Sequence, residues 1–319
     1  MKRYTSSIIK LTVFIAAAVI VYVCTPHTRE PVKITDVPAG KGFSVVEDKL
    51  PLYDGLGDDA KVVRYLAFGE KIFPKMQSEL FYQLKLGKDE EGKPIFGYVK
   101  KRGILIYNPK KKHVALTFDD GPSQATTPIV LEALKKYNCR ATFFVVGRML
   151  DNRGMNLLRR EVAQGCEIGN HSYSHPLFTD LKKRDVNKQL DRTDRLIYNA
   201  IGTTPKICRA PYGGFNKMVL NAMKRPNIYW SVDTLDWKTK SSKKTFKAVK
   251  KNVKDGAIVL MHDIHMPTAK AAGRICRFLK KDFETVTVTE LASIQGRKLI
   301  GGRNYAYIEK ENTKNAKYK

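Results

Sequence analysis

Two adjacent carboxylates stand where an apolar run ends near the middle of the chain. Asp119 and Asp120 follow the run Val114–Phe118 and precede a Gly-Pro pair at positions 121 and 122. Successive residues that leave a strand point in different directions, so one carboxylate can bind a cation while the other faces water or a substrate. Asp-Gly is also a common turn sequence whose carboxylates are simply solvated. The motif alone favours neither interpretation.

Two histidines four residues apart are a second feature with metal-binding chemistry. His171 and His175 lie in the segment 170–176, directly after another apolar run. On one helical turn or in a tight loop, both imidazoles can reach one point and suit zinc or another borderline metal. Such a pair alone is more often a surface feature. With an aspartate from a neighbouring strand end, it makes a ligand set that leaves coordination positions open, as a catalytic site requires.

Strand-like and helical patterns alternate beyond Asn108, and this alternation places these residues at strand ends. Apolar runs of strand length occur at Val114–Phe118, Ala141–Val146, Cys166–Gly169, Ile207–Pro211, Ile228–Val232, Ala257–His262 and Val286–Val288. Helical patterns fall between them at Thr127–Tyr137, Leu157–Gln164, Val186–Ala200, Lys243–Val253 and Ala269–Lys280. The order predicts an α/β fold with a parallel sheet, closed or open. Chemistry in such folds collects at the carboxyl ends of the strands.

The first residues of the chain have the pattern of an export signal. Residues 1–10 are basic, and residues 11–24 form an apolar run, so we predict a signal anchor or signal peptide over residues 1–25. The small-residue pattern of a cleavage site is poor around residues 21–24, which slightly favours an uncleaved anchor with its N-terminus inside. Residues 26–40 carry three prolines and are predicted to be a linker.

A small all-β domain is predicted over residues 41–108, where short apolar runs alternate with turn-prone stretches. Leu50-Pro51-Leu52-Tyr53, Gly69-Glu70-Lys71-Ile72 and Phe96-Gly97-Tyr98-Val99 resemble the opening, central and closing segments of the bacterial SH3-like domain. This resemblance implies a module that binds cell-wall material or, equally, a spacer. No binding residue can be named from the sequence.

Charge and cysteine content narrow the class of partner. The chain has 58 Lys plus Arg against 31 Asp plus Glu, a net charge of +27, which favours a polyanionic neighbour. Nucleic acid does not fit the export segment, and no RNA-recognition signature is present. Anionic wall polymers are therefore the expected partners. Cys139, Cys166, Cys208 and Cys276 are scattered without a CxxC pair, which disfavours a thiolate zinc site and predicts buried thiols.

Five short segments occur in a fixed order and carry a second resemblance. They are TFDDGPS at 117–123, HSYSHP at 171–176, RAPYG at 209–213, DTLDW at 233–237 and LMHD at 260–263. Together they resemble the five motifs of the NodB-homology polysaccharide deacetylases, carbohydrate esterase family 4. The resemblance implies a distorted (β/α)7 barrel over residues 111–298, followed by a basic C-terminal tail at 299–319.

The resemblance also implies roles for the first three segments. Asp120, His171 and His175 would hold a divalent metal, which is expected to be zinc, although cobalt, nickel and manganese accept the same ligands. Asp119 would be the general base. Arg209 would pair with Asp119 and keep it ionised.

Roles for the remaining positions follow from the same resemblance. The backbone N–H of Tyr212 would help to hold the oxyanion, and His262 would be the general acid, oriented by Asp236. Trp237 and Leu260 would line a pocket for the acetyl methyl group. Taken singly, Arg209, Trp237 and Leu260 are more often ordinary surface or core residues, and only the complete motif set reverses that preference.

The combined features predict a membrane-anchored or secreted N-deacetylase. The expected reaction is metal-dependent hydrolysis of the N-acetyl group of N-acetylglucosamine in cell-wall peptidoglycan, outside the cytoplasmic membrane. The sequence leaves N-acetylmuramic acid, chitooligosaccharide, exopolysaccharide and acetylxylan open as substrates, because the groove loops have no readable code. A non-catalytic wall-binding protein is the alternative from another class, and the complete acid, base and ligand set argues against it.

Overall fold

The computed structural model describes residues 34–309 and divides the chain into two compact units. One, which we call the β unit, consists of residues 34–39, Pro51–Tyr65 and Phe73–Arg102; the other, the barrel unit, consists of Gly40–Leu50, Leu66–Ile72 and the chain from Gly103 onwards. Within the described residues, no helix is both long enough and apolar enough to span a bilayer. The signal segment predicted at residues 1–25 lies outside the described range.

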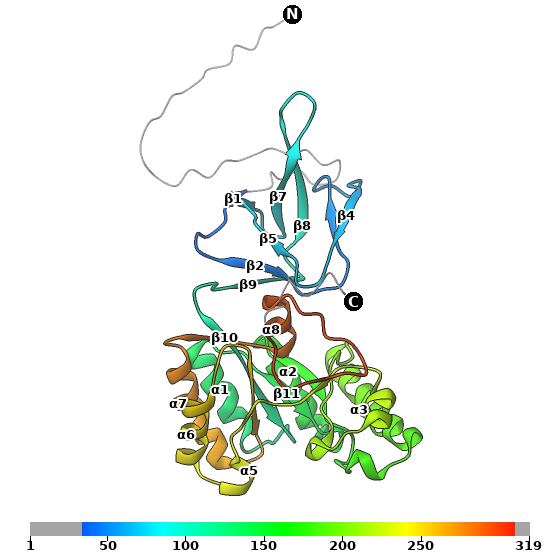
Figure 1. The fold of residues 1–319 in the computed structure, drawn as a ribbon, viewed down its shortest axis with the longest axis vertical. Helices are drawn as coiled ribbons and strands as arrows, with labels where there is room; N and C mark the ends of the chain where they lie inside the picture. Colours follow the sequence, from blue (N-terminus) through cyan, green and yellow to red (C-terminus); the bar gives the residue numbers. More distant parts are fainter. Residues whose placement is uncertain (1–33, 310–319) are drawn as a thin grey trace, which may run out of the picture. The chain divides into compact units, whose positions relative to one another are not determined.

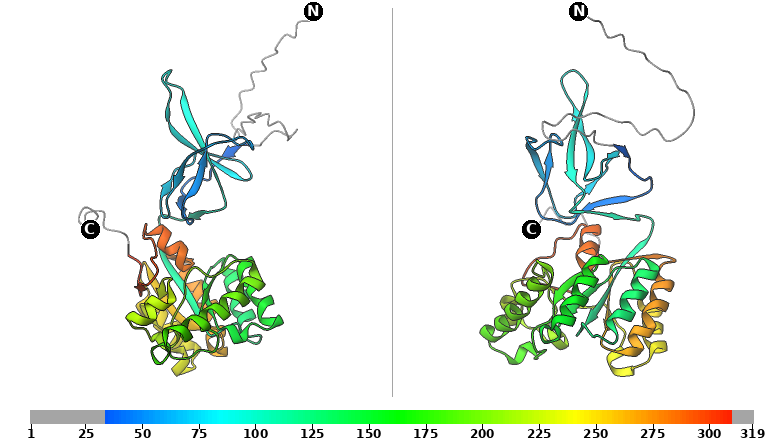
Figure 2. Two further views of the ribbon diagram at one scale, coloured as in Figure 1. Left: turned by 90° about the vertical axis from the view of Figure 1, so that its right-hand side faces the viewer. Right: turned by 180° about the vertical axis from the view of Figure 1, so that it is seen from behind.

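The β unit is built on an antiparallel sheet with the strand order β1-β6-β7-β8-β3-β4. The first half of β7, in its long hairpin with β8, alternates half-buried and buried side chains, and Tyr82 and Leu84 point into the core. Figure 2 shows this hairpin in cyan. The strands are β1 Thr35–Asp36, β3 Leu50–Tyr53, β4 Val62–Leu66, β6 Met76–Gln77, β7 Phe81–Lys88 and β8 Pro94–Lys100.

A second small sheet, formed by strands from the range predicted as one β domain, belongs to the barrel unit. Strands β2 Gly42–Val45, β5 Lys71–Ile72 and β9 Ile104–Tyr107 pair in the order β5-β2-β9. Ser44 Oγ lies 2.7 Å from Ser293 Oγ, and Lys71 Nζ donates to the Ser293 and Ile294 carbonyls at 2.9 Å each. These carbonyls end a helix, where a cation is favoured. The predicted range 41–108 is thus divided between the two units.

The central sheet of the barrel unit is parallel and nearly all of its residues are buried. Strand β10 lies at its centre, with β15 along one edge and β11 and β16 sharing the other. The strands are β10 Lys112–Asp119, β11 Thr142–Val145, β12 Glu167–Asn170, β14 Val232–Asp233, β15 Ala257–His262 and β16 Phe283–Val286. Burial on both faces explains their unbroken apolar character in the sequence.

Helices cover this sheet in two groups, as Figures 1 and 2 show. The helix α1 packs on α7 and α7 on α6, while α2 packs on α3. The longer helices are α1 Thr127–Tyr137, α2 Asn152–Ala163, α3 Lys183–Ile201, α6 Ser242–Asn252 and α7 Met266–Leu279; the shorter ones are α4 Lys217–Met223, α5 Asp236–Thr239 and α8 Val288–Ile294. All five predicted helices are present, with α2 beginning five residues earlier than predicted.

Two predicted strands around the Arg209 side chain are wrong in detail. The run Ile207–Pro211 pairs only through isolated bridges at Cys208, and Ile228–Val232 splits into β13 Asn227–Ile228 and β14 Val232–Asp233. The Arg209 side chain donates to the carbonyl oxygens of Ile228 and Tyr229, which are therefore unavailable to a continuous ladder.

The end of the described chain folds onto the barrel unit. Thr287 and Glu290 form a reciprocal capping box, so helix α8 starts at Val288, where a strand had been predicted. Part of the predicted basic tail forms β17 Asn304–Tyr305, which pairs in parallel with β13. Ile308, four residues further along than Asn304, is fully buried. The tail up to this point is therefore part of the fold.

Candidate active and metal site

The aspartate pair leaves the sheet at the carboxyl end of β10. Asp119 is the last residue of the strand and pairs in register with His262, the last residue of β15. Asp120 has a left-handed φ of 75°, which turns its side chain away from that of Asp119. A side chain at Gly121 would collide with the buried carboxylate of Asp263. The glycine is therefore required by this close approach.

A tightly hydrogen-bonded loop carries the two histidines. Asn170 ends β12, and its side-chain oxygen accepts from the Ser172 N–H at 2.8 Å. The Gln189 side-chain oxygen, from α3, accepts from the backbone N–H groups of Tyr173 and Ser174 at 2.9 and 2.8 Å. His175 itself has a φ of 63°. These hydrogen bonds offset the cost of a non-glycine residue in this region.

Asp120, His171 and His175 converge on one point and fit a metal ion. Their potential ligand atoms all lie within 4.8 Å of one another, and no other such group of His, Cys, Asp or Glu occurs within residues 34–309. The Nε2 atom of His175 lies 3.2 Å from both Asp120 Oδ1 and His171 Nε2. His171 Nδ1 contacts the Arg209 carbonyl oxygen at 2.8 Å, which directs the lone pair of Nε2 towards the cluster.

The electrostatics of this cluster favour metal ligands in the correct ionisation state. Burial lowers the pKa of His171 despite the nearby charges of Asp119 and Asp120, so its imidazole is neutral at neutral pH. Burial raises the pKa of Asp120, but the adjacent His175 imidazole, 3.2 Å from Oδ1, outweighs burial together with the other nearby imidazoles and holds the pKa of Asp120 below its usual range. Asp120 Oδ1 is buried, and no residue between 34 and 309 donates a hydrogen bond to it, as expected of an atom that binds a cation.

Asp119 and Arg209 form a buried ion pair beside this cluster. Arg209 Nη1 donates to Asp119 Oδ1 at 2.6 Å and to Thr117 Oγ1 at 2.8 Å. The guanidinium also lies over the Phe144 ring at 4.1 Å from its centroid. The other carboxylate oxygen of Asp119 lies 3.6 Å from His171 Nε2. One oxygen of Asp119 is therefore committed to Arg209, and the other faces the candidate metal site.

A second histidine–aspartate pair lies at the end of β15. Asp236 Oδ1 contacts His262 Nδ1 at 2.8 Å, and Asp236 Oδ2 accepts from the His262 N–H at 2.8 Å and from Thr268 Oγ1 at 2.6 Å. Burial disfavours the charged imidazole, but Asp236 outweighs this effect, with help from Asp119 and Asp120, and raises the pKa of His262 to about 9. His262 is therefore protonated at neutral pH.

The three remaining predicted site residues differ in exposure. Tyr212 has a φ of 58° and is 70% exposed, and its ring packs on that of His175 at 4.5 Å between centroids. Its backbone N–H has no acceptor among the described residues. Trp237 is 48% exposed, whereas Leu260 is buried in β15. Tyr212 and Trp237 thus present large side chains to solvent.

Several polar residues that position the site were not singled out in the sequence. Thr268 holds Asp236, Gln189 and Asn170 hold the histidine loop, and Thr127 donates to the Asp263 carboxylate. Thr, Gln and Asn are common on any helix or loop, so no sequence signal separates them from surface residues. The four described cysteines are buried and free, as predicted.

Comparison with known proteins decides the family. A family model for polysaccharide deacetylase matches residues 106–229. The solved peptidoglycan deacetylase PdaC from Bacillus subtilis is 39% identical, with a TM-score of 0.58 over 59% of this chain and 94% of that one. The chain belongs to the polysaccharide deacetylase family.

Other members of the polysaccharide deacetylase family share the same region. The peptidoglycan-N-acetylglucosamine deacetylase PgdA of Listeria monocytogenes is 43% identical over 196 residues, which are 61% of this chain and 41% of PgdA. The chain thus matches less than half the length of that relative. A family 4 acetyl xylan esterase from Clostridium thermocellum, solved with a cobalt ion, is 35% identical with a TM-score of 0.60, covering 62% of this chain and 99% of that one.

Proposed function

We propose that this protein hydrolyses the N-acetyl group of N-acetylglucosamine residues in cell-wall peptidoglycan and releases acetate. The observation that carries the proposal is the placement of two complementary groups at the carboxyl ends of strands in one sheet. One is a candidate metal-ligand cluster beside a buried Asp119–Arg209 pair, after β10 and β12, and the other is His262, held by Asp236 at the end of β15. Amide hydrolysis needs an activated water, a stabilised oxyanion and a proton for the departing amine. The two groups supply these requirements separately.

Asp120, His171 and His175 are the proposed metal ligands. The set of two imidazoles and one carboxylate suits zinc, with cobalt, nickel or manganese as substitutes, and it leaves positions open for water and substrate. A bound divalent metal would acidify water and polarise the acetyl carbonyl. The hydrogen bond between His171 Nδ1 and the Arg209 carbonyl oxygen fixes the tautomer that this role requires.

Asp119 is the proposed general base. Its Oδ2 atom faces the ligand cluster and takes the proton from the attacking water, while Arg209 holds Oδ1 and prevents the carboxylate from rotating away. The N–H of Tyr212, which has no acceptor in the described part of the chain and is fixed by the left-handed backbone of the RAPYG turn, donates to the developing oxyanion.

His262 is the proposed general acid. Its Nδ1 is occupied by Asp236, so Nε2 is the atom that delivers a proton to the leaving nitrogen. A pKa of about 9 keeps this proton in place at neutral pH. Each positioned proton transfer contributes about 10²- to 10⁴-fold to the rate. Exposed Trp237 and the end of β15 at Leu260 would line the space for the acetyl methyl group.

The proposed setting is the outer face of the cytoplasmic membrane. The apolar segment predicted at residues 1–25 would anchor the chain with the barrel unit outside, or would direct secretion if it is cleaved. The high net positive charge would favour contact with anionic wall polymers. The names of PgdA and PdaC, both peptidoglycan deacetylases, support this choice of polymer.

Acetate release from purified peptidoglycan by residues 28–319 tests the proposal. We expect release that is abolished by a chelator, restored by added zinc and absent from the Asp119→Asn variant. Chitin oligomers and acetylated xylan are assayed in parallel. Release from an oligomer but not from peptidoglycan would show that the polymer is wrong, and no release from any substrate would favour a protein that only binds.

A further inference from the structure

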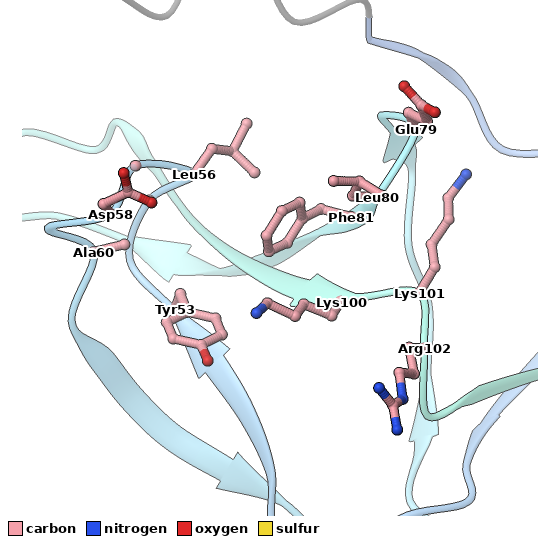
Figure 3. A pocket seen from close by; sticks show the side chains of 12 residues that line it. Tyr53, Leu56, Asp58, Ala60, Glu79, Leu80, Phe81, Lys100, Lys101 and Arg102 are labelled. Atoms are coloured by element: carbon pink, nitrogen blue, oxygen red, sulfur yellow. The ribbon is translucent and has the colours of Figure 1, made fainter. Parts of the chain in front are cut away.

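The β unit contains an open pocket of about 600 Å³ that no proposed function explains. Figure 3 shows its lining. Apolar and aromatic side chains share this pocket with a basic edge. The lining residues are Tyr53, Gly55, Leu56, Gly57, Asp58, Ala60, Glu79, Leu80, Phe81, Lys100, Lys101 and Arg102.

The basic edge is formed by three consecutive residues at the end of β8. Lys100 and Arg102 are exposed, and Lys100 extends towards Tyr53 with its Nζ 6.0 Å from the ring centroid (Figure 3). Lys101 Nζ lies 5.1 Å from the Tyr82 ring centroid. Within residues 34–309, none of the three cations forms an ion pair with a carboxylate. All three therefore retain their capacity to bind an anion.

The floor of the pocket carries apolar and aromatic side chains. Leu80 is 65% exposed, and the rings of Tyr53 and Phe81 are only half-buried. A polyanion that binds by charge alone needs no such floor, whereas an exposed leucine beside two half-buried aromatic rings offers apolar surface that a ligand can cover. Sugar rings present C–H faces that pack on aromatic side chains, while their substituents reach polar groups at the rim.

We propose that this pocket binds a glycan segment of the cell wall whose substituents carry free carboxylates. A ring of the glycan packs on Phe81 and Tyr53, and separate carboxylates of the glycan lie against Lys100 and against Arg102, whose planar guanidinium suits a carboxylate. The side chains of Asp58 and Glu79 accept hydrogen bonds from sugar hydroxyls. The choice of peptidoglycan as the polymer rests on the proposed function, whereas the pocket itself lies in the β unit and takes no part in acetate release.

An acidic glycan would use both the basic edge and the apolar floor of the pocket, whereas a polyol phosphate would use the basic edge alone. A polyol phosphate has charge but few apolar faces, so its binding would follow the cations and disappear at high salt. An acidic glycan also uses Leu80 and the rings, so part of its affinity survives high salt. Chemical blocking of carboxylates removes the partner of Lys100 and Arg102 without altering the sugar rings.

The test is co-sedimentation of the full chain with insoluble peptidoglycan that has been stripped of phosphate polymers, in the presence of a chelator so that no acetate is released. We expect Lys100→Ala/Arg102→Ala to weaken binding roughly five- to tenfold, because two partly exposed charge pairs are lost. Leu80→Ser, at an exposed position that tolerates a small polar residue, is expected to weaken binding by a further few-fold. The reason is that a bound glycan would no longer cover the apolar surface of the leucine. Lys85→Ala/Lys88→Ala removes the same charge from exposed positions outside the pocket and serves as the matched control.

A second arm identifies the chemistry and separates the two proposals. Amidation of the peptidoglycan carboxylates with an uncharged amine is expected to abolish the difference between the Lys100→Ala/Arg102→Ala variant and the unmodified chain. The proposal is overturned if the difference persists after amidation, if it appears only on walls that retain phosphate polymers, or if the control variant binds equally weakly. Acetate release from soluble chitin oligomers, measured with metal, stays unchanged in the pocket variant, so failure of the pocket and failure of the deacetylase are read independently.

Discussion

The two halves of the candidate site use the same side chain in opposite ionisation states. His171, at the end of β12, is fully buried and its pKa is lowered, whereas the pKa of His262, at the end of β15, is raised to about 9. The Nδ1 atom of His171 contacts a neutral group, the backbone carbonyl of Arg209. The Nδ1 atom of His262 contacts a negatively charged group, the Asp236 carboxylate. Burial at His171 and the carboxylate partner at His262 together set which imidazole is neutral, as proposed for a metal ligand, and which is protonated, as proposed for an acid.

This difference shows that the role of a histidine in a motif depends on its burial and on the hydrogen-bond partner of the ring nitrogen that faces away from the site. Both groups lie at the carboxyl ends of strands in one sheet, and both receive charge from Asp119 and Asp120. Those carboxylates raise the pKa of each histidine. At His171 burial outweighs them and lowers the pKa, and at His262 the Asp236 carboxylate outweighs burial and raises it. Variants that change one partner at a time should separate the two halves.

The largest effect is expected from removing the charge of the ligand cluster. Asp120→Asn should lower acetate release roughly 10³-fold or more, because a neutral amide oxygen binds a divalent cation far more weakly than a carboxylate. Metal content of the purified variant, measured by elemental analysis, should fall in parallel. Asp282→Asn, at an exposed position away from the site, is the matched control. Full activity together with a full complement of metal in Asp120→Asn would show that the metal lies elsewhere.

The second prediction changes the acid half alone. Asp236→Asn removes the charge that raises the pKa of His262, so the rate at neutral pH should fall about 10²- to 10⁴-fold, while the metal content stays the same. In the proposed mechanism the protonated imidazole of His262 is the active form, so activity of the unmodified chain should decline as pH rises through about 9. In the variant this decline should move to lower pH, towards the ordinary histidine value of about 6.5.

The same pair predicts a pH-dependent contribution to stability. A raised pKa in the folded state stabilises the fold fully below the unfolded value of about 6.5, and this contribution is lost as pH rises through about 9. Thermal unfolding of the unmodified chain across this range, compared with Asp236→Asn, measures the difference. Asp233→Asn, three residues away, controls for the amide substitution. For activity, a decline in acetate release that stays near pH 9 in Asp236→Asn would show that His262 is not the group that delivers the proton.

A smaller effect is expected in the metal half from the residue that holds the histidine loop. Gln189→Ala removes the acceptor shared by the N–H groups of Tyr173 and Ser174, so the loop that carries His175 should loosen. We expect roughly tenfold weaker zinc binding, with near-normal turnover once metal is saturating. Titration of the metal-free chain with zinc measures the first quantity, and Gln124→Ala, on an exposed position, is its control. Loss of turnover at saturating metal would mean that Gln189 supports more than the ligands.

The sequence predicts the ligands of this site better than it predicts their supports. Five ordered motifs single out Asp120 and His262 through the family resemblance that they carry together, and the structure brings both residues to the carboxyl ends of the strands. Gln189 lies in the middle of a long helix, and only the folded chain shows that its side chain reaches a loop fifteen residues earlier. Supports act through hydrogen bonds to backbone groups, and a sequence does not show which backbone groups are near.

The fold shows the same division between strong periodic signals and tertiary effects. Apolar runs predict β10 and β15 well, because a strand that is buried on both faces is an unbroken apolar run in the sequence. The run Ile228–Val232 breaks because Arg209 binds its carbonyl oxygens, which is a tertiary effect. Likewise, residues 40–50 and 66–72 have ordinary β texture, and only contacts such as Ser44 with Ser293 assign them to the barrel unit.

The smallest effect is expected in the acid half from Thr268→Val. Valine keeps the shape of threonine but removes the hydroxyl that donates to Asp236 Oδ2 at 2.6 Å. Asp236 would still be held by the backbone N–H of His262, so its charge remains and its position loosens. One hydrogen bond to a charged group is worth about 1.5–3 kcal/mol in stability, and we expect most of this loss in unfolding rather than in catalysis.

For activity, Thr268→Val should lower kcat two- to tenfold, on the order of 1 kcal/mol, with KM unchanged. Without the Thr268 donor, the negative charge of Asp236 is less neutralised and stabilises the His262 imidazolium at least as strongly. The decline in activity at high pH should therefore stay near pH 9 or move slightly higher, opposite to the shift in Asp236→Asn. Thr268→Ser, which restores the hydroxyl, should recover the rate. A decline that moves to lower pH in the valine variant would show that Thr268 maintains the contact between Asp236 and His262, and does not merely position the carboxylate.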